Sequence, residues 1–115
     1  MNITIYHNPK CSKSRQALAL LTDRNIVPEI IEYTKDLLSE GQIRALAERL
    51  NCSETPRDMM RCKEADYKEN NLAEADNDAL FKAMAKHPKL IERPIIITDK
   101  GAVIARPPEN LLALL

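Results

Sequence analysis

Polar and apolar residues alternate at the start of the chain, and residues 2–6 therefore predict a β-strand. Residues 7–10 interrupt the alternation, and apolar residues then recur at helical spacing as far as Leu21. Residues 29–33, Glu-Ile-Ile-Glu-Tyr, predict a second strand. A strand, a helix and a strand within so short a segment predict a right-handed β-α-β unit with parallel strands.

The middle of the chain, about residues 39–87, has apolar residues at helical spacing. The pair Ser39–Gln42 resembles a capping box, and Thr55 before a proline and Asp76 predict further helix starts. His87 followed by a proline predicts the end of the last of these helices.

Strand-forming residues return after this helical stretch. Residues 94–98 predict a strand, residues 99–101 a turn, and residues 102–105 a strand that pairs back as a hairpin. The segment that begins at residues 106–109 predicts a final helix.

The order of these elements predicts an α/β fold in a single domain that spans residues 1–115. A four-stranded mixed sheet flanked by helices is the simplest arrangement that buries the apolar faces. The helices of about residues 39–87 form an insertion between the β-α-β half and the β-β-α half. The sequence contains no internal repeat and no linker that would divide it.

The composition narrows the range of functions. Apolar residues make up 44% and charged residues 30% of the chain, which is typical of a folded protein. Lys plus Arg and Asp plus Glu number 17 each, so no basic excess indicates a nucleic-acid partner. Two glycines are too few for a glycine-rich phosphate loop. Neither a membrane-spanning segment nor a signal peptide is predicted, so we expect no membrane partner.

The cysteines indicate a reducing compartment. Their number is odd and their spacing, Cys11, Cys52 and Cys62, is irregular, which argues against a disulfide framework. His7 and His87 are too isolated to complete a metal site with them, so we expect no metal. The sequence therefore favours a cytoplasmic protein in which at least one thiol serves a chemical purpose.

Cys11 is the thiol best placed for chemistry, because a strand gives way to a helix there. A thiolate at a helix N-terminus faces unpaired backbone N–H groups and the positive end of the helix dipole. Such a position lowers the pKa of a thiol from about 8.5 to roughly 3.5–7.5. His7, Lys10, Lys13 and Arg15 are near in sequence and would add to this effect.

Four segments of the chain resemble one known family. Residues 6–15, Tyr-His-Asn-Pro-Lys-Cys-Ser-Lys-Ser-Arg, are similar to the active-site loop of the glutaredoxin-coupled arsenate reductase (ArsC) family. Residues 90–96 and 105–109, each with an Arg-Pro pair, resemble its second and third signatures, and residues 59–73 its helical insertion. The resemblance covers nearly the whole chain and is closest to the shorter, arsenate-reductase-like branch of the family.

This resemblance implies a thioredoxin-like fold and a set of site residues. Cys11 falls on the nucleophile, with His7 expected to tune it and Ser14 to support its thiolate. Pro94 falls on the cis-proline of the fold. The oxyanion-binding arginines fall on Arg61, Arg93 and Arg106. The guanidinium fork suits a tetrahedral oxyanion because it can donate two parallel hydrogen bonds.

The resemblance also implies the activity, an oxidoreductase that converts arsenate to arsenite. The expected partners are arsenate or a similar oxyanion, glutathione and glutaredoxin. Glutathione is then a co-substrate that supplies electrons, and no bound cofactor is expected.

Two alternatives remain open. One is a redox-responsive regulator of the Spx type, which shares the fold and binds RNA polymerase; many such proteins carry a second cysteine where this chain has Ser14. The other is a thiol oxidoreductase with a different substrate. Phosphatase-like arsenate reductases are excluded, because they need an arginine where this chain has Ala17. A dithiol thioredoxin or glutaredoxin is disfavoured by Ser14 as well.

The remaining cysteines and arginines are interpreted as structural or solvated. Cys52 and Cys62 fall on no catalytic position of the family. Arg15 is a weaker second choice for the site because it is close to Cys11. The other arginines are expected to lie in solvent: Arg24, Arg44, Arg49 and Arg57.

Overall fold

The computed structural model describes residues 2–115, which form two compact units. Unit 1 consists of the residues up to Asp36 together with Arg93–Leu115, and unit 2 is Leu37–Glu92. Unit 2 thus covers the helical insertion predicted for about residues 39–87; the one-domain organisation stays a prediction. No helix of residues 2–115 is both long enough and apolar enough to span a bilayer.

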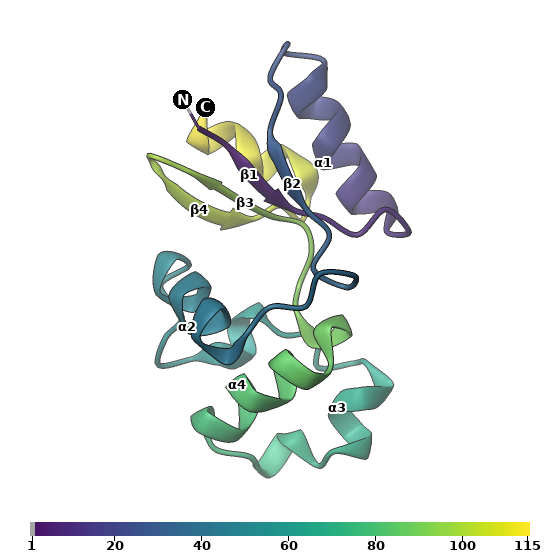
Figure 1. Ribbon diagram of the computed structural model, residues 1–115, viewed down its shortest axis with the longest axis vertical. Coiled ribbons are helices and arrows are strands. Elements are labelled where there is room, and N and C mark those ends of the chain that lie inside the picture. Colours follow the sequence, from purple (N-terminus) through teal and green to yellow (C-terminus); the bar gives the residue numbers. More distant parts are fainter. Residues whose placement is uncertain (1) are drawn as a thin grey trace. The chain divides into compact units, whose positions relative to one another are not determined.

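Unit 1 is built on a four-stranded mixed sheet, which confirms the predicted fold class (Figure 1). The strand order is β2-β1-β3-β4; β1 pairs with β2 in parallel and with β3 antiparallel, and β3 and β4 form the antiparallel hairpin. The β-α-β and β-β-α halves therefore meet at the β1–β3 pair. The strands are β1 (Thr4–Tyr6), β2 (Glu29–Ile31), β3 (Ile95–Thr98) and β4 (Gly101–Ile104).

The core of unit 1 joins the sheet to α1 (Ser12–Thr22) and to the 3₁₀ helix η4 (Pro108–Leu114), which also pack against each other. Ile5 of β1 pairs with Ile96 of β3, and both are fully buried. Each fully buried side chain of this size stabilises the fold by about 1.5–3 kcal/mol. The other buried members of the cluster are Ile3, Ala17, Leu21, Ala105 and Leu111.

The boundaries of all four strands differ from the prediction by one or two residues. The second strand ends at Ile31, two residues before the predicted end, because the chain turns from Tyr33. The last helix is a 3₁₀ helix. The segment that follows α1 contains Asn25, whose φ of 60° lies in the left-handed region that Asn tolerates after a helix.

Unit 2 is helical throughout, and two of its predicted helix starts are confirmed. Ser39 and Gln42 form the reciprocal capping box, and the Asp76 side chain accepts a hydrogen bond from the Ala79 N–H. A helix also begins after Thr55, but it is a short 3₁₀ helix and the Thr55 side chain does not cap it, so the predicted cap was wrong. The elements are α2 (Glu40–Arg49), η1 (Pro56–Met59), α3 (Ala65–Glu69), η2 (Leu72–Glu74), α4 (Asn77–Lys86) and η3 (Pro88–Leu90).

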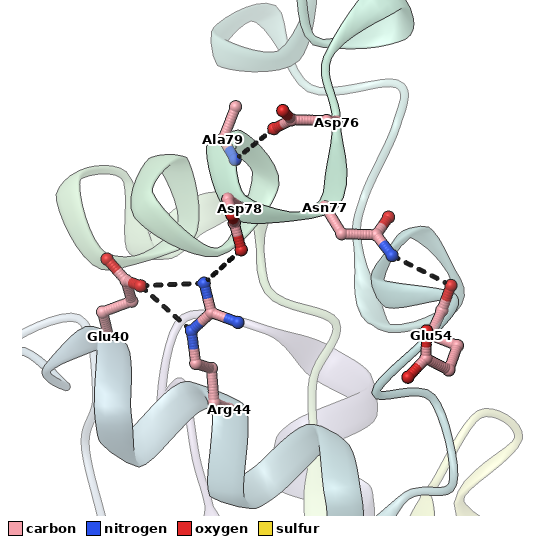
Figure 2. Close-up of polar contacts among 7 residues, drawn as sticks. All are labelled: Glu40, Arg44, Glu54, Asp76, Asn77, Asp78 and Ala79. Atoms are coloured by element: carbon pink, nitrogen blue, oxygen red, sulfur yellow. Dashed lines mark hydrogen bonds and ion pairs between the residues drawn. The ribbon is translucent and has the colours of Figure 1, made fainter.

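Arg44 links α2 to α4 rather than lying free in solvent as expected (Figure 2). Its Nη2 lies 2.9 Å from carboxylate oxygens of both Glu40 and Asp78. The guanidinium carbon is also 4.4 Å from the centre of the Phe81 ring. The cation therefore covers an apolar face of the helix pair while both carboxylates hold it in place.

Arg57 is a second arginine for which the solvated interpretation was wrong. Its Nη2 donates to the carbonyl oxygens of Leu72, Ala73 and Ala75, and its Nε donates to the Tyr67 hydroxyl at 3.1 Å. These carbonyls belong to η2 and the residue after it; the Leu72 carbonyl also accepts the Ala75 N–H at 3.2 Å, and helix-end carbonyls such as those of Ala73 and Ala75 take their partners from outside the helix. One half-buried cation thus ties η1 to the segment from α3 to η2.

We expect Arg57→Met to lower the free energy of unfolding by about 1.5–3 kcal/mol, since hydrogen bonds to a charged group are lost and the Ala73 and Ala75 carbonyls lose a donor. Arg24→Met is the matched control: Arg24 is exposed and makes one long bond, 3.4 Å, to the Leu20 carbonyl. That control should stay within about 0.5 kcal/mol of the unchanged protein. Urea denaturation followed by circular dichroism measures both, and equal losses would contradict the role given to Arg57.

Candidate functional site

Cys11 lies between the end of β1 and the start of α1. It is the N-cap of α1, with extended backbone (φ −95°, ψ 123°), and its side chain is partly exposed. Its carbonyl accepts the Arg15 N–H at 3.0 Å and so begins the helix. No acidic residue occupies the first turn of α1, so nothing there opposes a negative charge at this position.

The sulfur of Cys11 is surrounded by hydrogen-bond donors. Burial by itself would raise the pKa of this thiol, but three donors and a positive charge outweigh it and leave the pKa below its ordinary value. The donors are the backbone N–H groups of Ser14 and Lys13 and the Arg93 side chain, and the charge is that of Arg93. The site therefore favours the thiolate, the form in which a cysteine is a nucleophile.

Arg93 and Arg106 reach the sulfur from the two ends of the β3–β4 hairpin. Arg93 precedes β3 and Arg106 follows β4, and the Ala105 N–H donates to the Pro94 carbonyl at 2.9 Å, which holds these ends together. Nη1 of Arg106 lies 3.9 Å from the Cys11 sulfur and 3.1 Å from the Arg93 carbonyl oxygen. The Arg93–Pro94 and Arg106–Pro107 peptide bonds are both cis; only the first was expected from the sequence.

The guanidinium of Arg93 has two N–H groups without a hydrogen-bond partner among the described residues. Its Nε and Nη1 are buried and have no hydrogen-bond partner among residues 2–115. An unsatisfied buried donor costs about 1–3 kcal/mol, more when it is charged, so native proteins rarely retain one without a purpose. Unpaired donors on a cation that lies close to a thiolate favour an anion as the ligand of this guanidinium.

His7 and Ser14 form a buried pair beside Cys11. His7 Nδ1 lies 2.6 Å from Ser14 Oγ, which also accepts the Asn8 N–H at 3.0 Å. Burial lowers the pKa of His7, with Arg15 acting in the same direction and Glu32 against it, so the imidazole is neutral at neutral pH. His7 therefore meets the site through Ser14, whose backbone N–H is the group that contacts the sulfur.

Arg61 belongs to unit 2. Its backbone N–H donates to the Leu90 carbonyl at 2.7 Å, and its Nε forms an ion pair with Glu64 at 3.2 Å. Arg93 and Arg106 therefore lie in the same unit as Cys11. A role for Arg61 in the same anion site stays a prediction.

The other two cysteines differ from Cys11 in their surroundings. Cys52 is buried, and burial, with a smaller contribution from Asp58, raises the pKa of its thiol. Cys62 is exposed in unit 2, and its sulfur lies 3.9 Å from the Met60 carbonyl oxygen. Neither has the array of donors that surrounds Cys11.

Arg15, the second choice from the sequence, also contributes to the site. It donates from Nη1 to the Pro9 carbonyl at 2.9 Å and so braces the loop before Cys11. Tyr33 was not named from the sequence; it is fully buried, and after Cys11 it is a further cause that raises the pKa of Arg93. Tyr33 lies at the end of an apolar run, where a tyrosine is ordinarily interpreted as core; only its place beyond a strand parallel to β1 could have indicated the site.

Unit 1 thus has a thioredoxin-like sheet with a single thiol at a helix start and two arginines close to it. Comparison with known proteins agrees: the ArsC family model matches residues 6–114, and the chain belongs to this family. An arsenate reductase of Haemophilus influenzae is 44% identical, with 100% of both chains covered.

Solved structures agree with the fold. The arsenate reductase from Vibrio cholerae is 50% identical and has a TM-score of 0.94, covering 100% of this chain and 98% of that chain. The putative arsenate reductase from Yersinia pestis is 45% identical, with a TM-score of 0.91, and covers 97% of this chain and 99% of that one.

The lowered pKa of Cys11 predicts a distinct alkylation profile. With Cys52→Ala and Cys62→Ser in place, the rate of reaction with iodoacetamide reports Cys11 alone. Because the pKa is lowered, the thiolate persists as the pH falls, and the midpoint of the rate profile should lie below that of free cysteine, about 8.5. Arg93→Gln should move this midpoint upward, since a hydrogen bond and a positive charge are lost.

Lys35→Gln is the control for the loss of a positive charge, because Lys35 is exposed and lies in unit 1. A Cys11 midpoint at or above that of free cysteine, or the same shift in both variants, would contradict the site described above.

Proposed function

We propose that this protein is an arsenate reductase in which the Cys11 thiolate reacts with arsenate and glutathione with glutaredoxin supplies the electrons. The observation that carries the proposal is Arg93, whose buried Nε and Nη1 lack partners while the same guanidinium hydrogen-bonds to Cys11. The family membership and the arsenate reductases among the relatives support the choice of arsenate as the oxyanion.

Arsenate is a tetrahedral anion at neutral pH, and the arginine forks hold two of its oxygens by charge-assisted hydrogen bonds. Arg93 and Arg106 supply these donors in unit 1, and we place Arg61 with them as the third. The backbone donors at the start of α1 stabilise negative charge in the same region. As the sulfur attacks, charge grows on the oxygens, and the same donors stabilise it.

The first step forms a bond between Cys11 sulfur and arsenic, and one arsenate oxygen leaves as water after protonation. A glutathione thiolate then attacks the Cys11-bound arsenate. A sulfur–sulfur bond forms between Cys11 and glutathione, and the sulfur–arsenic bond breaks with its electron pair left on arsenic. Arsenic goes from the pentavalent to the trivalent state, and two thiols have been oxidised to one disulfide.

Glutaredoxin then reduces the mixed disulfide by thiol–disulfide exchange and returns Cys11 to the thiolate. Ser14 stands where a resolving cysteine would lie in a dithiol protein, which is why an external thiol is required. This cycle needs a reduced thiol pool, so we place the protein in the cytoplasm. No bound organic cofactor is part of the cycle.

The test is arsenate-dependent oxidation of NADPH, coupled through glutathione, glutaredoxin and glutathione reductase. The unchanged protein should turn over, and Cys11→Ser should reduce the rate to background because the nucleophile is lost. Cys62→Ser, an exposed thiol outside unit 1, is the matched control and should keep the rate. Arg93→Lys should raise the KM for arsenate about tenfold or more, since the charge is kept but the fork is lost.

Turnover of Cys11→Ser at the normal rate would reject the reaction scheme. Turnover with thioredoxin but not with glutathione and glutaredoxin would reject the reductant and leave the substrate in place. Rapid turnover with another oxyanion and none with arsenate would favour the alternative of a thiol oxidoreductase with a different substrate.

A further inference from the structure

Basic side chains gather at the start of α1, where a helix ordinarily favours acidic ones. Lys10, Lys13 and Arg15 are all close to Cys11 in the sequence. The chain has no acidic residue before Asp23, although Lys plus Arg and Asp plus Glu number 17 each overall. The first turn of α1 accordingly contains no acid. Because the N-terminal end of a helix carries partial positive charge, cations there destabilise it. Local rules of this kind are typically broken at functional sites.

The two lysines differ from Arg15 in what they contact. Arg15 donates from Nη1 to the Pro9 carbonyl at 2.9 Å, so its side chain contributes to the loop itself. The side chains of Lys10 and Lys13 are exposed, and neither ammonium group has a hydrogen bond or an ion pair among residues 2–115. No contact within the described part of the fold therefore accounts for these two charges.

The backbone on either side of Cys11 fixes where the two lysines leave the chain. Lys10 lies in a turn that is closed by the Cys11 N–H on the Asn8 carbonyl at 2.9 Å, and its own N–H donates to Asn8 Oδ1 at 3.0 Å. Lys13 lies in the first turn of α1, where its backbone N–H hydrogen-bonds to the sulfur. Since consecutive Cα atoms are about 3.8 Å apart, both charges lie on the order of one Debye length, about 8–10 Å, from the sulfur. An anion that reaches Cys11 therefore passes through the potential of both.

We propose that Lys10 and Lys13 are specificity-determining residues for the reductant, because their ammonium groups attract the carboxylates of an anionic thiol, glutathione, to the Cys11 sulfur. This role rests on the function proposed above and assigns residues to its co-substrate. Glutathione has one more carboxylate than it has ammonium groups, so it is an anion before its thiol ionises. The step served is the attack of the glutathione thiolate on Cys11 sulfur. The sulfur–sulfur bond forms as the sulfur–arsenic bond breaks and leaves its electron pair on arsenic.

The charge of the Cys11-bound arsenate is the reason why the reductant needs this attraction. Its oxygens keep negative charge, and a glutathione thiolate that approaches the same sulfur is repelled by them. Arg93 and Arg106, which lie close to the sulfur, hold that oxyanion in the proposed cycle. The incoming anion therefore needs cations other than these two, and the lysines on either side of Cys11 supply them.

Lysine also suits a co-substrate that arrives and departs in every cycle. An ammonium group is a strongly hydrated point charge on a flexible stem, whereas a guanidinium is a planar fork with fixed directions. The fork favours an oxyanion that is held in one orientation, and the ammonium favours a charged molecule that is captured and released. At exposed positions such an attraction raises the rate of encounter more than it raises affinity.

The test replaces arsenate by disulfides, with Cys52→Ala and Cys62→Ser in place so that Cys11 reacts alone. The Cys11 thiolate attacks one sulfur of oxidised glutathione, a mixed disulfide forms, and one glutathione leaves as the thiolate. Lys10→Gln combined with Lys13→Gln should lower this rate roughly 3- to 10-fold relative to the rate with the neutral hydroxyethyl disulfide. The rate with cystamine, a cationic disulfide, should rise in the same variant. The neutral reagent corrects for any change in the reactivity of the thiol.

The matched control, Arg24→Gln with Lys100→Gln, removes two positive charges from the same unit far from Cys11. Arg24 follows the other end of α1, whose 11 residues span about 16 Å. Lys100 lies in the turn between β3 and β4, at the opposite end of the hairpin from Arg93 and Arg106. This control should leave the ratio of the rates unchanged. In about 1 M salt, where the Debye length is about 3 Å, the lysine variant should match the unchanged protein.

The coupled assay adds a second measurement. At saturating arsenate, the lysine variant should lower kcat/KM for glutathione by a similar factor. If the unchanged protein fails to reduce arsenate, the function proposed above fails, and the disulfide rates still decide whether the lysines select an anionic thiol. A ratio of rates that is the same in the lysine variant and the unchanged protein, or that falls equally in the control, would overturn the proposal.

Discussion

The contact between the Cys11 sulfur and the Arg93 guanidinium is the interaction on which the site depends. Burial by itself would raise the pKa of the thiol and lower the pKa of the guanidinium, in both cases against the charged form. Each group reverses the effect for the other: the pKa of Cys11 is lowered and the pKa of Arg93 is raised. The contact therefore stabilises the thiolate, while the guanidinium is charged in either case.

The sheet of unit 1 is what makes this contact possible. Because β1 lies between β2 and β3, the segment that leaves β1 toward Cys11 has a neighbour on each side. The β3–β4 hairpin then returns the chain to the same place, so Arg93 and Arg106, at its two ends, meet one sulfur. The strand registers and the β3–β4 turn thus bring Arg93 and Arg106 close to Cys11, although both lie far from it in the sequence.

Most of unit 1 could be predicted from the sequence because its strands are β-branched runs and its helix has regular apolar spacing. The errors arose where local signals were weaker than tertiary contacts. Thr55 and the proline after it are typical of a helix start, yet the chain forms one 3₁₀ turn whose Arg57 bonds to a distant helix end. Arg44 was likewise interpreted as solvated because its partner Asp78 lies 34 residues away.

The site, like the fold, has features that the sequence could predict and features that it could not. Cys11, Arg93 and Arg106 could be named because each lies in a short motif, a strand-to-helix turn or an Arg-Pro pair. Their convergence could not, since spacing along the chain says nothing about distance across a sheet. Tyr33 could not be named either, because a buried tyrosine at the end of a strand is usually core.

The unpaired donors of Arg93 lower the stability of a protein whose free energy of unfolding is only about 5–15 kcal/mol. A sequence shaped by stability alone would pair these donors with acceptors of the protein itself. In this chain the guanidinium contacts the Cys11 thiolate, and Nε and Nη1 have no hydrogen-bond partner among residues 2–115. That arrangement is costly in the free protein and becomes favourable once an anion is bound, so the cost is itself the reason to assign Arg93 to a ligand.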